Sequence, residues 1–220
     1  LGVVPLVMWS LLALTAGLPA EVVQTSQSLI AETAEQEGLA SAAVVTLGGQ
    51  VHDLVVHQHA GRTLVEFEQR AADDDVASFA LMAHRAMERL KKAPDMQALL
   101  NRLVAEVRSL TGFDRVMAYR FRHDQSGEVV AESVRADLDP CLGRRYPASD
   151  IPAQARRLYV LNSLRLIGDV GYQPVPLVGQ AGEAPLDLTH AVLRSVSPIH
   201  IEYLHNMGVG ASMSVSIVVA

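Results

Sequence analysis

The segment from Arg144 to Tyr159 (RRYPASDIPAQARRLY) constrains the fold most, because it places two prolines, one aspartate and four arginines within sixteen residues. Pro147 fixes its own φ and favours an extended conformation in the residue before it. Ser149 or Asp150 can then cap a helix. We therefore expect an extended entry, a rigid turn with Asp150 at its tip, and a helix from Ala153 to about Leu164. An ordinary capped helix start is the simplest interpretation.

The length and charge of the chain limit its class. Its 220 residues are enough for two modest domains, and 50% hydrophobic with 19% charged residues indicate a globular protein. A net charge of −6 argues against generic nucleic-acid binding. Cys141 is the sole cysteine, which excludes an internal disulfide and a cysteine zinc cluster and is compatible with a reducing cytoplasm.

Arginines are concentrated in one part of this acidic chain. Sixteen of the 18 basic residues are arginine, and nine of those lie between Arg115 and Arg165 with six acidic residues, a local excess of +3. Arginine binds planar carboxylates and phosphates through two parallel hydrogen bonds. The excess indicates a small anionic ligand, although a solvated face of ion pairs gives the same pattern.

The first 20 residues carry no charge, and an uncharged segment of this length is long enough for a membrane span. There is no basic segment before them, and Pro5 and Gly17 interrupt the apolar run. The residues that follow, Glu21 to Gln24, continue in a strand-like pattern. We therefore expect buried strands of a small α/β domain and no membrane segment.

Residues 40–70 show strand alternation interrupted by two glycine turns, which predicts an antiparallel meander. His57 and His59 lie two apart on one strand face, a spacing that a metal site can use. With no cysteine or carboxylate close in the sequence, a solvent-exposed pair is the preferred interpretation, and no metal site is expected.

Asp73-Asp74-Asp75 marks the expected domain boundary, so that residues 1–72 and 73–220 form two domains. Two helices should follow it, Phe79 to Lys92 with an apolar stripe and Met96 to Leu110 opened by Asp95 and closed by Gly112.

The second domain should continue with strands and one further helix. Phe113 to Phe121 and Glu128 to Glu132 read as a hairpin. A helical pattern runs from Leu186 to Met207, interrupted by Pro198, and Ala211 to Val219 reads as a final strand with serines on one face. A Ser/His/Asp triad can be drawn from Ser212, His200 and Asp150, but no Gly-x-Ser-x-Gly elbow is present, so no catalytic residue is assigned and enzyme chemistry is not expected.

Two long motifs carry a family resemblance. YPASDIP (146–152) and RSVSPIHIEYLHNMG (194–208), in this order and after the hairpin, resemble the bilin-binding GAF domain of bacteriophytochromes. The resemblance covers Phe79 to the C-terminus in detail and residues 1–70 more loosely as the preceding PAS domain. It implies an α/β (α+β) fold, a PAS domain at 1–72 and a GAF domain at 73–220, each an antiparallel sheet with flanking helices.

The resemblance also implies biliverdin IXα, a linear tetrapyrrole, as chromophore, with light-driven Z/E isomerisation at C15=C16. It places the Asp150 carbonyl by the pyrrole nitrogens and His200 near the inner rings. Further residues that it implies are Tyr119, Tyr146 and Tyr203 around ring D; Tyr159, Arg165 and Arg194 at one propionate; Ser212 and Ser214 at the other; and Ile151 and Ser197 in the same site.

Partners follow from the same resemblance. It implies a homodimer that forms through the long helices, a C-terminal output module, expected to be a histidine kinase with its response regulator, and a cytoplasmic location, with no nucleic acid or membrane partner.

Three departures concern attachment and completeness. Ile199 stands where plant and cyanobacterial phytochromes have the chromophore cysteine, and no cysteine precedes the PAS part. The PAS part is short, and the GAF part lacks its last strand and helix. Cys141, in Asp139-Pro140-Cys141-Leu142, resembles the Asp-x-Cys-Phe element of some cyanobacteriochromes. We expect Cys141 at the chromophore pocket, and covalent attachment and simple packing both stay open.

A red/far-red photoreceptor fragment is therefore the prediction. The alternatives are a GAF domain that binds another small anionic ligand, such as a cyclic nucleotide or heme, and a non-photoactive dimerisation scaffold. A reversible absorption change on illumination separates the three.

Overall fold

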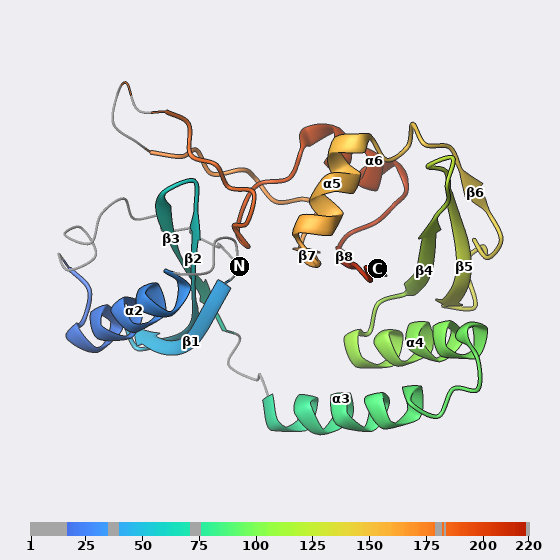
Figure 1. The fold of residues 1–220 in the computed structure, drawn as a ribbon, viewed down its shortest axis with the longest axis horizontal. Helices are drawn as coiled ribbons and strands as arrows, with labels where there is room; N and C mark the ends of the chain where they lie inside the picture. The colour runs from blue at the N-terminus through green and yellow to red at the C-terminus, as the bar shows by residue number, and fades with distance from the viewer. Residues whose placement is uncertain (1–16, 35–39, 71–75, 179–181, 183, 219–220) are drawn as a thin grey trace. The chain divides into compact units, whose positions relative to one another are not determined.

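The computed structural model describes residues 17–34, 40–70, 76–178, 182 and 184–218. The chain divides into two compact units, one built from residues 1–72 and 157–220 and the other from residues 73–156 (Figure 1). The expectations for residues 1–16 and for the acidic break 73–75 fall outside the described residues. Within the described part, no helix combines the length and apolarity needed to cross a membrane.

A three-stranded antiparallel sheet in the order β1-β2-β3 opens the first unit, as the meander predicts. The strands are β1 (Ala40–Leu47), β2 (Gln50–His59) and β3 (Arg62–Gln69). Gly48 and Gly49 have φ of 59° and 79°, which other residues rarely adopt, so this pair makes the tight turn between β1 and β2.

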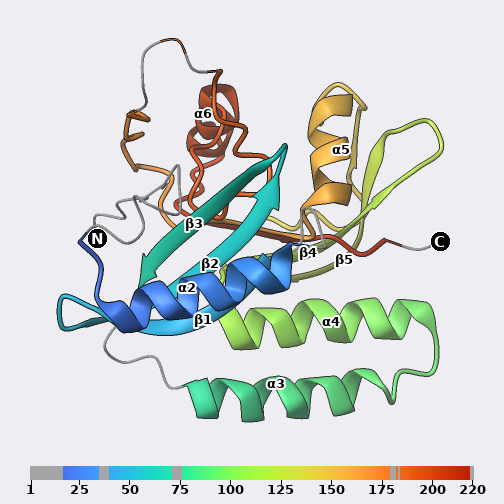
Figure 2. The same cartoon turned by 60° about the vertical axis from the view of Figure 1, so that its left-hand side comes forward.

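Helix α2 (Ala20–Thr33) covers one face of this sheet (Figure 2). The strand-like interpretation of residues 21–24 is therefore wrong. Val22, Ser26, Leu29 and Thr33 are buried at helical spacing, and the hydroxyls of Ser26 and Thr33 donate to carbonyls one turn earlier. A β-branched pair such as Val22-Val23 is compatible with a strand or a helix. The stripe of buried residues from Val22 to Thr33 indicates the helix.

The core between α2 and the sheet is aliphatic and aromatic. Its buried members are Val22, Leu29, Val45, Leu54, Val56, Val65 and Phe67. Residues on β2 and β3 alternate, so the neighbours of these side chains in the sequence, His57 and Glu66 among them, lie on the opposite face.

Two strands and a helix from the C-terminal part complete the first unit. β7 (Leu164–Ile167) pairs antiparallel with β8 (Ser212–Val215), and α6 (Pro198–Asn206) precedes β8. Helix α5 (Ala153–Leu161) begins as expected but ends earlier, because the chain from Leu164 onward is already a strand. The terminal strand is likewise shorter than the predicted Ala211 to Val219.

The expected helix from Leu186 to Met207 is wrong before Pro198. Residues 184–197 are irregular, with turns at 189–190 and 192–193, and Pro198 is the first residue of α6, where its missing N–H costs nothing. Gly208 ends α6 with a φ of 69°, as expected. The backbone N–H groups of Val192 and Leu193 donate to the side chain of Glu66 on β3 instead of to carbonyls of a helix.

The second unit contains α3 (Val76–Leu90), α4 (Met96–Thr111) and the antiparallel sheet β4-β5-β6. Its strands are β4 (Arg115–Phe121), β5 (Gly127–Val134) and β6 (Arg145–Tyr146). Helix α4 packs against β4 and β5 and also against α3 (Figure 1). The predicted ends of α4 are confirmed: the Asp95 carboxylate accepts the N–H of Ala98 at 2.7 Å, and Gly112 has a φ of 73°.

Candidate ligand site

The turn around Asp150 is held by an arginine of the helix that follows it, α5. Tyr146 is extended in β6, and the Pro147 carbonyl accepts the N–H of Asp150 at 3.1 Å. The guanidinium of Arg156 donates to the carbonyls of Ala148, at 3.1 Å, and Ile151. Arg156 was not among the residues predicted from the sequence, although its position four residues after Pro152, in the first turns of a helix, directs its side chain back to the turn. The rigid turn with Asp150 thus has a specific support.

Tyr119 and Tyr146 lie together in the second unit. Their ring centroids are 6.0 Å apart, and the Tyr119 ring also meets that of Phe121 edge-on at 5.3 Å. A register shift between Ala118 and Tyr119 re-aims the strand at this point. The Tyr119 ring lies across Gly127, where any Cβ would overlap its hydroxyl and ring atoms.

Cys141 is half-buried and has a free thiol. Arg115 Nη1 lies 2.9 Å from its sulfur, and the same guanidinium pairs with Glu132. Glu132 Oε2 also accepts the backbone N–H groups of Cys141 and Leu142, at 2.8 and 2.9 Å. A buried carboxylate that was not singled out in the sequence therefore holds both the backbone and the cationic neighbour of the thiol.

Arg165 is the centre of the second group, in the first unit. Its guanidinium lies 3.5 Å above the Tyr159 ring and donates to the Ser214 hydroxyl at 3.3 Å from Nε and 3.4 Å from Nη2. Arg165 and Ser214 face each other in the register of β7 with β8, and Ile167 faces Ser212. Because residues two apart on a strand share a face, both serines lie on the Arg165 side.

Three basic side chains, those of Arg165, Arg194 and His200, share this region. Burial, opposed by Tyr159 and reinforced by Arg194, lowers the pKa of Arg165. Burial also lowers the pKa of Arg194, opposed by Glu66. The pKa of His200 is lowered by burial and then by Arg165. Half-buried positive charge of this kind is stabilised by an anion that accepts hydrogen bonds from guanidinium groups.

The remaining predicted residues lie on α6. Ser197 precedes the helix, and its carbonyl accepts the N–H groups of His200 at 2.9 Å and Ile201 at 3.1 Å. His200 and Tyr203 are one turn apart on α6. The predicted site residues thus form two sets, one with Tyr119, Tyr146, Cys141, Asp150 and Ile151 in the second unit and one with Tyr159, Arg165, Arg194, Ser197, His200, Tyr203, Ser212 and Ser214 in the first.

His57 and Glu66 form a buried pair that was not predicted from the sequence. His57 is 0% exposed, so the expectation of a solvent-exposed histidine pair is wrong for this residue. Its Nδ1 lies 3.6 Å from Glu66 Oε1, and the His190 ring lies 6.2 Å from the His57 ring. His59 contacts Asp187 at 3.1 Å. Among the described residues no group of histidines, cysteines and carboxylates could hold a metal ion.

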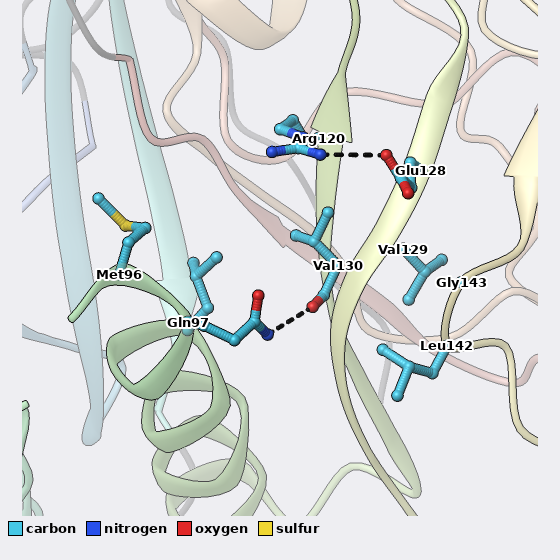
Figure 3. A pocket seen from close by; sticks show the side chains of 9 residues that line it. Met96, Gln97, Arg120, Glu128, Val129, Val130, Leu142 and Gly143 are labelled. Atoms are coloured by element: carbon cyan, nitrogen blue, oxygen red, sulfur yellow. Dashed lines mark hydrogen bonds and ion pairs between the residues drawn. The ribbon is translucent and has the colours of Figure 1, made fainter.

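A separate pocket of about 470 Å³ lies in the second unit between the start of α4, β5 and residues 142–143 (Figure 3). It is lined by none of the predicted site residues. Gln97 Nε2 donates to the Val130 carbonyl at 2.9 Å, and Arg120 pairs with Glu128 at 3.1 Å across its rim. Since these two charges balance each other, the pocket lacks the excess positive charge found around Arg165.

The sequence matches proteins of one family. Residues 95–220 match the GAF domain model. Over 79% of its length the chain is 54% identical to a bacteriophytochrome of Pseudomonas aeruginosa, and over 75% it is 46% identical to cyanobacterial phytochrome B of a Nostoc species. These matches cover 24% and 23% of the two relatives, so the chain spans about a quarter of their length.

The fold matches solved structures of the same family. The chromophore-binding domain of a Stigmatella aurantiaca phytochrome superposes with a TM-score of 0.81 at 43% identity, over 91% of this chain and 68% of that domain. A bacteriophytochrome from R. palustris superposes with a TM-score of 0.78 at 35% identity, over 92% of this chain and 42% of that one. The predicted mixed fold with antiparallel sheets is confirmed, and the chain belongs to the phytochrome family, with a GAF domain at residues 95–220.

Proposed function

We propose that this chain holds biliverdin, a linear tetrapyrrole with two propionate side chains, and serves as the light-sensing part of a red/far-red photoreceptor. The observation that carries the proposal is the half-buried cluster of Arg165, Arg194 and His200 beside Ser214. Positive charge that is partly removed from water favours a carboxylate ligand held through charge-assisted hydrogen bonds. The similarity to phytochromes identifies the class of ligand that brings such carboxylates.

In this proposal, residues of the first unit bind the two propionates and hold the protonation of the pyrrole nitrogens. Arg165 and Arg194, with Tyr159, bind one propionate, and Ser212 and Ser214 donate to the other. His200 has a lowered pKa, so at neutral pH its ring is neutral and offers one N–H donor and one acceptor nitrogen, through which it holds the protonation of the pyrrole nitrogens.

The other predicted residues orient the pyrrole rings of the ligand in this proposal. The Asp150 carbonyl accepts pyrrole N–H groups from a turn that Arg156 and Pro147 keep rigid. Tyr119, Tyr146 and Tyr203 surround ring D, and Ile151, Cys141 and Ser197 complete the lining. The chemistry that the bound tetrapyrrole supplies is light-driven Z/E isomerisation at C15=C16.

The domain and partner assignments belong to the same proposal. Residues 1–72 are the PAS domain and residues 73–220 the GAF domain. The signal passes to an output module, a histidine kinase with its response regulator, in the cytoplasm. A homodimer forms along α3, where the side chains of Phe79 and Met87 are 51% and 56% exposed.

Co-expression with a heme oxygenase, followed by absorption spectroscopy before and after red and far-red illumination, tests the proposal. We expect a long-wavelength band that shifts reversibly. Arg165→Ala should weaken biliverdin binding by about 10–100-fold, because hydrogen bonds to a charged group are the stronger kind. Arg157→Ala, which removes an exposed arginine of α5, is the matched control and should bind as the wild type does.

Other outcomes assign the site differently. A Soret band and no red band would indicate heme, and a featureless spectrum would support a non-photoactive scaffold. Equal affinities of Arg165→Ala and Arg157→Ala would remove the role given to Arg165.

A further inference from the structure

A buried carboxylate on β3 holds a segment from the C-terminal half of the chain. Glu66 on β3 is 2% exposed. Its Oε1 accepts the N–H of Val192 at 3.0 Å, and its Oε2 accepts the N–H of Leu193 at 2.8 Å. These partners lie 126 and 127 residues further along the chain. A carboxylate removed from water needs such donors, so the segment around residues 192–193 is fastened to the sheet at this point.

The fastened segment leads directly into Arg194. The Arg194 guanidinium folds back and donates from Nη1 to the Ala191 carbonyl at 2.5 Å, and Ala191 is itself 3% exposed. The position of Arg194, in both backbone and side chain, therefore depends on residues 191–194. Glu66 holds the middle two of these four residues.

The charges of Glu66 and Arg194 also act on each other. Burial raises the pKa of Glu66, while the N–H groups of Leu193 and Val192 and the charge of Arg194 oppose that rise. Arg194 in turn is desolvated and is favoured in its charged form by Glu66. His57 also lies against Glu66, with its Nδ1 3.6 Å from Glu66 Oε1. Neither ring nitrogen of His57 is hydrogen-bonded to a described residue.

We propose that Glu66 is a positioning residue for Arg194: its two oxygens fix the backbone of residues 192–193 and so set where the Arg194 guanidinium meets a ligand carboxylate. The inference rests on the proposed function, since it concerns the propionate side of that site. Glu66 touches no ligand itself and acts through Arg194.

The chemistry of the clamp requires a glutamate. Two consecutive N–H groups need two acceptors side by side, and a carboxylate provides both. In Glu66→Gln one acceptor becomes an NH₂ group that faces an N–H, so one hydrogen bond is lost. Glu66→Asp keeps the charge but withdraws both oxygens by one methylene. Glu68→Gln is the matched control. Glu68 lies two residues further along β3 on the same strand face, and its substitution removes the same charge as Glu66→Gln.

The first measurement is amide hydrogen exchange of Val192 and Leu193 in the ligand-free chain. We expect about tenfold faster exchange in Glu66→Gln and Glu66→Asp, the effect of losing a hydrogen bond, and no change in Glu68→Gln. Unchanged exchange in both Glu66 variants would overturn the clamp. Because Glu66→Asp keeps the negative charge, it remains informative if Glu66→Gln does not fold.

The second measurement is a double-mutant cycle on biliverdin affinity with Arg194→Ala. Glu66→Gln should raise the Kd about tenfold in the wild-type background and should add nothing once Arg194 is removed, because its effect passes through Arg194. Additive losses, or an unchanged Kd in Glu66→Gln, would overturn the positioning role alone. If the wild-type chain binds no biliverdin while the exchange result holds, the proposed function fails and the positioning role fails with it.

Discussion

His57 is fully buried on β2, and burial dominates its chemistry. Burial first, and then the positive charges of His190 and His59, lower its pKa from 6.5 to about 4. The ring is therefore neutral at pH 7 and lies against Glu66, the clamp residue. At the scale of single residues, His57 and Glu66 lie side by side, and both meet residues of the segment 187–194.

A histidine with a depressed folded-state pKa stabilises the folded chain above pH 6.5 and loses that contribution as the pH falls toward 4. We expect the free energy of unfolding to fall by about 2 kcal/mol between pH 7 and pH 5 from His57 alone. Glu66, with its raised pKa, contributes in the opposite sense at low pH. Urea unfolding at both pH values measures the sum of these contributions.

Comparison with a variant isolates the histidine. His57→Leu should lose much less stability than the wild type over this range, whereas His84→Leu, on the exposed surface of α3, should lose as much as the wild type. An equal loss in His57→Leu and the wild type would show that His57 does not titrate in this way.

Cys141 is the second residue whose role can be decided alone. Its sulfur is in contact with Arg115 at 2.9 Å and its backbone is held by Glu132, an arrangement that suits a packed side chain. We expect bilin bound to residues 1–220 to be lost on denaturation, so that zinc-dependent fluorescence after gel electrophoresis is absent from both wild type and Cys141→Ser. A band in the wild type that disappears in Cys141→Ser would instead assign covalent attachment to this thiol.

At the scale of elements, the position of Tyr119 in the β4–β5 hairpin depends on Gly127, which has no side chain. The Tyr119 ring lies across Gly127 and contacts the rings of Phe121 and Tyr146. The register shift at Ala118/Tyr119 brings it there. The hairpin thus presents an aromatic group whose arrangement depends on one glycine.

Gly127→Ala should displace the Tyr119 ring, because the added Cβ would overlap it. We expect a loss of about 1–3 kcal/mol in the free energy of unfolding, as for overpacked sites, together with an altered photoconversion yield in the holoprotein. Gly168→Ala, where a Cβ meets nothing within 4 Å, is the control and should leave both quantities unchanged. A crystal structure of Gly127→Ala with Tyr119 in place would contradict the argument.

At the scale of the whole molecule, the first unit is built from both ends of the chain and the second from the residues between them. One face of the sheet β1-β2-β3 is covered by α2, which is adjacent in sequence, and the buried side chains of the other face meet residues from 187 to 194. Two hydrogen bonds from Glu66 therefore connect β3 with residues 192–193, which lie far from it in the sequence but in the same unit.

Local sequence determined much of this protein, and tertiary structure decided the rest. The meander, the capped ends of α4, the extended Tyr146 and the turn at Asp150 follow from signals a few residues long: glycine pairs, Asp95, Gly112 and Pro147. The two motifs identified the family, and the site residues that they imply stay a prediction.

Two of the missed features, the irregular segment before Pro198 and the burial of His57, involve partners distant in sequence. The segment before Pro198 has a helical pattern, but a carboxylate 126 residues away accepts the N–H groups of Val192 and Leu193, so the helix begins only at Pro198. His57 reads as an exposed strand residue and is buried by that same segment. Burial and hydrogen bonding between distant segments depend on which surfaces the folded chain brings together, and short-range patterns in the sequence carry no information about that choice.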